Sequence, residues 1–128
     1  MAKDYLDYPA YLVDNLQEKI IAIVMLPEYG DESSLKFIAK GDSLFCEIRF
    51  YNSSGNITIP SGTLIKSYSD IPELKMYEGR FRGSVSPICR HSDGAGMSHI
   101  IAYAWSGIRL EKSISFSGTS YYSYIQLV

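Results

Sequence analysis

The chain has 128 residues and a formal net charge of −2, with 46% hydrophobic and 20% charged residues. This composition excludes a disordered chain, and the length corresponds to a single globular domain, residues 1–128. Indiscriminate binding to nucleic acid needs a strongly basic domain, so we expect no bulk nucleic-acid binding.

The N-terminal sequence and the two cysteines predict a cytoplasmic protein. MAKDYLDY has no basic segment followed by an apolar one, and the longest apolar run, residues 20–26, is too short to span a bilayer. Cys46 and Cys89 occur in unlike contexts, so a disulfide framework is not indicated. We therefore expect free thiols and no membrane association.

The first predicted element is an amphipathic helix over residues 8–18. Asp7 can cap a helix and Pro9 is tolerated in its first turn. Apolar side chains then follow helical spacing, at Tyr8, Tyr11, Leu12, Leu16 and Ile20. The continuous apolar run at 20–26 predicts a central strand buried on both faces.

Alternation gives the strongest strand prediction, over residues 44–51. A turn at Gly41-Asp42 separates it from a preceding strand at 35–39. Two faces result: Leu44, Cys46, Ile48 and Phe50 point one way, and Phe45, Glu47, Arg49 and Tyr51 point the other.

The rest of the chain predicts further strands and one helical turn. Turn residues divide the strands at 56–59, 63–66, 80–85, 98–105, 108–117 and 120–127, with the helical turn at 71–77. The expected fold is strand-dominated α+β, an antiparallel sheet in a sandwich or partly open barrel with one N-terminal helix. Neither of the two commonest nucleotide-binding glycine motifs occurs, and we expect no cofactor.

The stretch RFRGSVSPICRHSDGAGMSH, residues 80–99, is the predicted binding site. Residues 80–112 carry five basic side chains against two acidic ones. Arginine presents a planar fork suited to phosphate or carboxylate, histidine adds a pH-dependent donor, and glycines expose backbone amides. This predicts anion binding by Arg80, Arg82, Arg90, His91, Gly94, Gly96 and His99. An ordinary loop with solvated arginines is the competing interpretation.

A catalytic or zinc site in the same stretch is the runner-up. Cysteine, histidine and aspartate can each bind zinc, and cysteine can act as a nucleophile. Cys89, His91 and Asp93 share a face in extended backbone, and His99 can return from the next strand. However, His91, Ser92 and Asp93 are adjacent, and adjacent residues in extended chain point to opposite faces, so the run alone is no catalytic triad. No metal-binding motif with specific spacing is present, and we assign no metal ligand.

The uncharged tail, SISFSGTSYYSYIQLV, is the predicted protein interface. It lacks the lysines and prolines that protect an edge strand from pairing with another chain, so we expect either a neighbouring strand or a partner to cover it. The interface residues are Tyr121, Tyr122 and Tyr124.

These features together predict a small non-enzymatic binding module. Its target is a protein partner, a second copy of the chain, or an anionic ligand such as a nucleotide. Accessory proteins of bacteria and phages, such as inhibitors and immunity proteins, have this size. The alternatives are a small hydrolase or metal-dependent enzyme centred on Cys89, His91, Asp93 and His99, and a structural subunit of an assembly.

Overall fold

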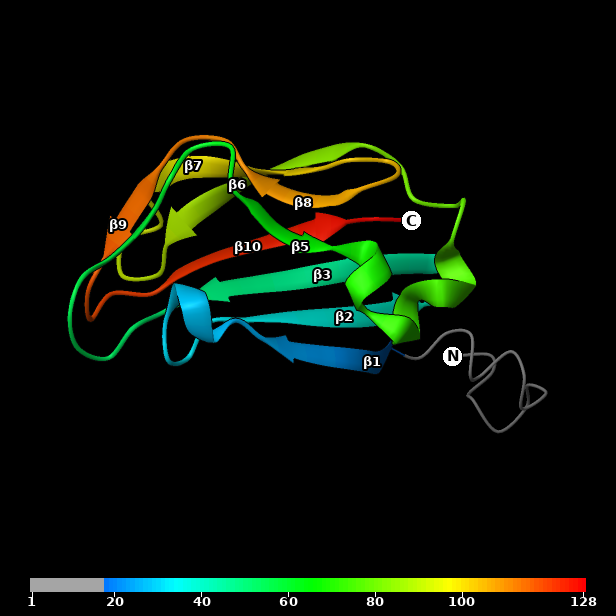
Figure 1. Ribbon diagram of the computed structural model, residues 1–128, viewed down its shortest axis with the longest axis horizontal. Coiled ribbons are helices and arrows are strands. Elements are labelled where there is room, and N and C mark those ends of the chain that lie inside the picture. Colours follow the sequence, from blue (N-terminus) through cyan, green and yellow to red (C-terminus); the bar gives the residue numbers. More distant parts are fainter. Residues whose placement is uncertain (1–17) are drawn as a thin grey trace, which may run out of the picture.

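The computed structural model describes residues 18–128 as antiparallel strands joined by short connections (Figure 1). The strands are β1 (Glu18–Met25), β2 (Ser34–Lys40), β3 (Ser43–Phe50), β4 (Ile57–Ile59), β5 (Leu64–Ser67), β6 (Ser84–Arg90), β7 (Gly96–Ala102), β8 (Gly107–Leu110), β9 (Ile114–Phe116) and β10 (Tyr121–Gln126). The helical elements of this part of the chain are three 3₁₀ turns, η2 (Pro27–Tyr29), η3 (Tyr68–Asp70) and η4 (Pro72–Tyr77).

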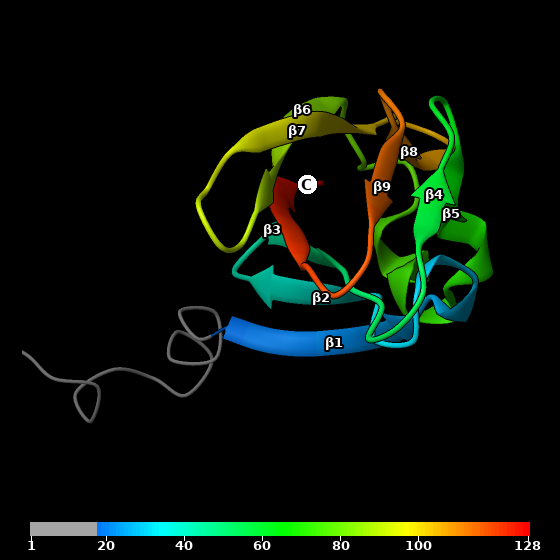
Figure 2. The ribbon, with the colours of Figure 1, turned by 90° about the vertical axis from the view of Figure 1, so that its left-hand side faces the viewer.

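Eight strands form one sheet in the order β1-β2-β3-β10-β6-β7-β8-β5, and β4 pairs with β9 in a second, two-stranded sheet. Seen from the end, the large sheet curls into an incomplete barrel (Figure 2). β4 and β9 lie next to each other at one side of this barrel. The expected strand-dominated, antiparallel architecture is confirmed, in its partly open barrel form. The helix expected at 8–18 lies outside the described residues except for Glu18, which begins β1.

The alternation over 44–51 is confirmed in β3. Its inward side chains, Leu44, Cys46, Ile48 and Phe50, are at most 1% exposed and pack in one core with residues such as Leu35 and Phe37. The connection to β2 is the expected two-residue turn, because Lys40 pairs with Ser43. Gly41 there has φ of 60°, as the first central position of a type II′ turn requires.

The apolar run at 20–26 is a strand, but the prediction that it is central and buried on both faces is wrong. β1 is the edge strand of the sheet and pairs only with β2. Ile20, Ile23 and Met25 are 58%, 58% and 55% exposed. A bulge between Ile20 and Ala22 keeps Ile21 and Ala22 toward the core and turns these three outward.

Other strand boundaries also differ from the predictions. Residues 80–83 precede the strand, and β6 begins at Ser84. The strand expected at 108–117 is divided into β8 and β9, while η4 lies where the helical turn was expected. No helix within residues 18–128 combines the length and apolar character needed to cross a membrane.

Candidate functional site

A concavity lies on the outer face of the sheet, over β2, β3 and β10. We call it the outer groove, and it has a volume of about 820 Å³. These three strands are neighbours, so the outward residues of each alternating strand form one continuous surface. The side chains that give the groove its chemistry are Lys36, Glu47, Arg49, His91, Tyr122 and Tyr124.

Two partly exposed tyrosine rings line the outer groove. Tyr122 and Tyr124 are 45% and 46% exposed, although they lie within the sheet. The ring of Tyr124 stacks on Phe45 with centroids 5.3 Å apart, and the ring of Tyr122 meets His91 edge-on at 5.8 Å. Partial burial, followed by the carboxylates of Glu18 and Glu47, raises the pKa of Tyr124. Its hydroxyl therefore remains a hydrogen-bond donor at neutral pH.

The cations of the groove form only weak ion pairs. Arg49 lies directly opposite Tyr122 in the β3–β10 ladder, and its Nη1 is 3.8 Å from Oε1 of Glu32. Lys36 Nζ is 4.0 Å from Oε2 of Glu47. Exposed pairs of this kind contribute about 0–1 kcal/mol. An incoming carboxylate or phosphate can therefore replace either glutamate at little cost.

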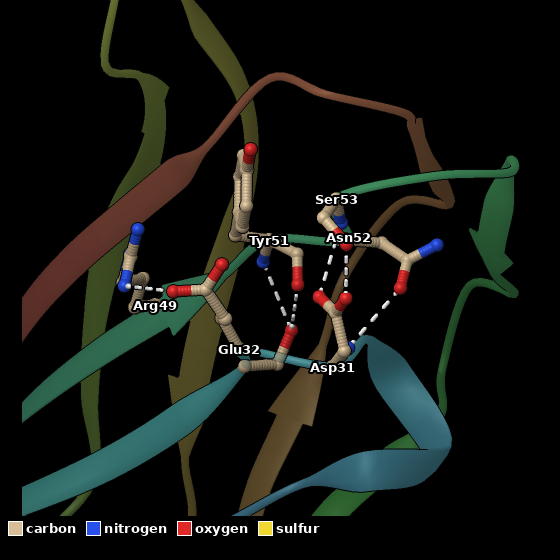
Figure 3. A network of polar contacts seen from close by, with 7 residues as sticks. Asp31, Glu32, Arg49, Tyr51, Asn52 and Ser53 are labelled. Atoms are coloured by element: carbon tan, nitrogen blue, oxygen red, sulfur yellow. Dashed lines mark hydrogen bonds and ion pairs between the residues drawn. The ribbon is translucent and has the colours of Figure 1, made fainter.

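A polar clasp holds Glu32 beside Arg49 (Figure 3). Asp31 accepts hydrogen bonds from the backbone N–H of Ser53, at 3.0 Å, and from the Ser53 hydroxyl, and its own N–H donates to Asn52 Oδ1 at 3.1 Å. The backbone N–H of Glu32 then donates to the Tyr51 carbonyl at 3.2 Å. The clasp joins the loop before β2 to the end of β3, and so fixes one end of the groove.

We expect the clasp to make the stability of the fold depend on pH in the acidic range. The hydrogen bonds from the Ser53 hydroxyl and then from its backbone N–H lower the pKa of Asp31. A carboxyl with a lowered pKa stabilises the fold above its unfolded pKa of about 3.9, and this contribution is lost as pH falls through the folded pKa. Asp31→Asn should therefore lower the melting temperature at neutral pH, and the difference from the parent should close in acid. The exposed Asp70 provides the control; a parallel pH profile for Asp31→Asn and Asp70→Asn contradicts this role.

The seven residues predicted to bind an anion do not form one cluster. Arg80 and Arg82 precede β6, whereas Arg90 and His91 lie at its other end, about 20 Å away at 3.3 Å per residue. Arg80 donates to the Asp42 carbonyl at 3.2 Å, and the backbone N–H of Arg82 donates to Leu127 at 3.0 Å. Both are therefore tied to the end of the barrel away from His91.

The remaining members of that set lie in and around the β6–β7 hairpin. Arg90 Nη1 is 3.3 Å from Asp93 Oδ2, and the Gly94 N–H donates to the Arg90 carbonyl at 2.7 Å. Gly96 begins β7, and His99 Nδ1 lies 3.1 Å from Glu111 Oε1. Of the seven, only His91 lines the outer groove, where its ring meets that of Tyr122; the other predicted interface residues, the buried Tyr121 and the half-exposed Tyr124, line the same groove.

The four residues of the catalytic or zinc alternative do not form one cluster either. Cys89 lies opposite Tyr122 on β10, Asp93 Oδ1 accepts from the Ala95 N–H at 3.0 Å, and His99 pairs with Glu111. Over residues 18–128, no three His, Cys, Asp or Glu side chains come close enough to hold a metal ion.

The tail predicted as an interface contains β9, which pairs with β4, and β10, which carries the three tyrosines and is an interior strand of the large sheet. β10 lies between β3 and β6, so neighbouring strands cover its edges. It pairs with β3 through six residues but with β6 only at Tyr121 and Tyr122. Farther along, the hydroxyls of Ser84 and Ser86 donate to the Gln126 and Tyr124 carbonyls at 2.7 and 2.8 Å. What remains accessible is its outer face, with the rings of Tyr122 and Tyr124.

Sequence reasoning did not assign Lys36, Glu47 or Arg49 to a site. Alternation had placed Glu47 and Arg49 on the outward face of β3, but only the pairing of β3 with β10 brings them to the tyrosines. A second, smaller pocket of about 320 Å³ was also missed; its aromatic side chains are Tyr68, Phe81 and the 85% exposed Trp105. The one signal for it was a lone tryptophan in a glycine-containing turn.

No protein-family model matches the chain, and no curated protein or solved structure is significantly similar to it.

Proposed function

We propose that the protein is a non-enzymatic binding module whose outer groove receives an acidic segment of a protein partner. The observation that carries this proposal is the position of Tyr122 between Arg49, its cross-strand partner, and His91, whose ring meets it edge-on. One aromatic surface thus has a guanidinium on one side and an imidazole on the other. A reducing compartment such as the cytoplasm suits this module, because Cys46 and Cys89 are both free.

The side chains favour a carboxylate-bearing target. Arginine offers paired N–H groups that match a carboxylate, and half of the Arg49 side chain is accessible despite its contact with Glu32. The guanidinium also lies 5.2 Å from the Tyr51 ring centroid, which restricts its orientation. Less conformational entropy is therefore lost when it binds.

The shape of the groove favours a polypeptide over a small molecule. Small-ligand sites usually enclose most of the ligand surface, whereas this groove lies on the outside of a sheet and leaves Tyr122 and Tyr124 nearly half exposed. Tyrosine and arginine are also the residues enriched at the energetic centres of protein interfaces. A nucleotide or another phosphate-bearing ligand is the competing target.

A hexaglutamate peptide is a suitable probe, with binding measured by calorimetry at low salt. Arg49→Gln should weaken binding by roughly 1.5–3 kcal/mol, about ten- to 150-fold in Kd, because a charge-assisted hydrogen bond is lost. Glu32→Gln should strengthen binding, because it removes the carboxylate that competes for Arg49. Lys112→Gln, an exposed position outside the groove lining, is the matched control.

The outcomes separate the possible targets. Tighter binding of ADP than of the peptide, with the same loss in Arg49→Gln, would reassign the groove to a phosphate-bearing ligand. Equal effects of Arg49→Gln and Lys112→Gln would show that the groove is not the binding surface.

A further inference from the structure

β1 has an open hydrogen-bonding edge. It lies first in the strand order and pairs only with β2. Among residues 18–128, no backbone group forms a hydrogen bond with the side of β1 that faces away from β2. In an antiparallel ladder, successive residues direct their N–H and C=O groups alternately to the two sides. About half of the eight residues of β1 therefore present backbone donors and acceptors that a further strand can pair with.

The chemistry of this edge favours strand addition. Its charged residues, Glu18 and Lys19, occupy one end, and the six residues from Ile20 to Met25 are uncharged and contain no proline. Natural edges are usually protected by shortness, inward charges or proline. The opposite edge strand, β5, has only four residues and includes Lys66. Of the two edges, only β1 is long and apolar.

The sequence of β1 is compatible with antiparallel pairing to itself. One register pairs all eight residues, with a two-fold axis between Ile21 and Ala22. It places Ile20 opposite Ile23 of a second copy, and both point outward; it places Ile21 opposite Ala22, and both point toward the core. A one-residue slip would set outward residues against inward ones. A bulge is one of the features that can protect an edge from pairing, but the bulge of β1 is what makes this register consistent.

We propose that β1 is a self-association edge, through which two copies of the chain join their sheets in an antiparallel, two-fold symmetric pair. Ile20, Ile23 and Met25 of both copies then form one apolar strip across the junction. A two-fold interface uses the same patch on each subunit, as this register requires. The junction is distinct from the Tyr122 surface, so its test is independent of the groove.

Sedimentation of the full chain tests the proposal. The parent should sediment as a dimer that dissociates on dilution. Ile20→Lys should sediment as a monomer with an unchanged circular dichroism spectrum, because it places a charge opposite Ile23 in the centre of the junction. Val85→Lys is the matched control. Val85 is 63% exposed, similar to Ile20, but its strand β6 lies between β10 and β7 and is not at an edge, so this variant should remain a dimer.

An isotope-filtered NMR experiment on a mixture of labelled and unlabelled parent tests the register. Contacts between the Ile20 methyls of one copy and the Ile23 methyls of the other are expected. A monomeric parent at every concentration overturns the proposal, as does a dimer that lacks these contacts. Intramolecular contacts from residues 1–17 to Ile20 and Ile23 would also overturn it, because the chain would then cover its own edge.

Discussion

Replacing Phe50 by alanine should lower the free energy of unfolding by about 3–5 kcal/mol, the usual cost of removing a fully buried phenylalanine. Phe50 is 0% exposed on β3, and its ring lies 6.2 Å from that of Phe116 on β9. Phe116 in turn meets Tyr121 of β10 edge-on at 5.8 Å. The substitution therefore leaves a cavity where the two-stranded sheet packs against the large one. Urea unfolding followed by circular dichroism measures the loss.

Tyr122→Ala provides the control for Phe50→Ala. Tyr122 is an aromatic residue of the neighbouring strand β10, but it points to the outer face and is 45% exposed. Because little packing is lost there, we expect a change below about 1 kcal/mol. Similar losses in the two variants would contradict the assignment of the two faces of the sheet.

Replacing Gly107 by alanine should also be strongly destabilising. A Cβ atom at Gly107 would overlap the Lys66 carbonyl and lie 2.9 Å from Cα of Ser67, both in the backbone of β5. Backbone cannot rotate away as a side-chain tip can, so β5 and β8 must separate. We expect a loss of about 1–3 kcal/mol or more, the range for overpacked sites, measured by thermal and urea unfolding.

Gly96→Ala is the matched control for Gly107→Ala. Gly96 also lies in a strand, but nothing is within 4 Å of an added Cβ atom. The variant should unfold within about 0.5 kcal/mol of the parent. If both alanine variants keep the parent's stability, the close pairing of β5 and β8 is incorrect.

Local sequence patterns predicted most of the strands but not their places in the sheet. Alternation identified both faces of β3, because one side chain in two must enter the core. The apolar run of β1 carried no such information: burial on both faces and exposure at an edge are both compatible with a continuous run. The position of β1 depends on which strands flank it, and that is decided by long-range pairing.

The candidate site was predictable only in parts for the same reason. The tyrosines of β10 and His91 were recognised as unusual, and Arg49 was assigned to an outward face. Their meeting depends on the pairing of β10 with β3, two segments at distant positions in the chain. The predicted grouping of Arg80 with Arg90 failed because a whole extended strand, β6, separates them. Proximity in sequence is a poor guide to proximity in space along an extended chain.

The most direct test of the proposed function is a titration of the isotope-labelled protein with hexaglutamate, followed by amide and arginine side-chain NMR signals. Signals of the outer groove should shift together in a salt-sensitive way, with the largest changes at Arg49, His91 and Tyr122. Shifts confined to Arg80 and Arg82, or an unchanged spectrum at saturating peptide, would contradict the assignment of the outer groove as the binding surface.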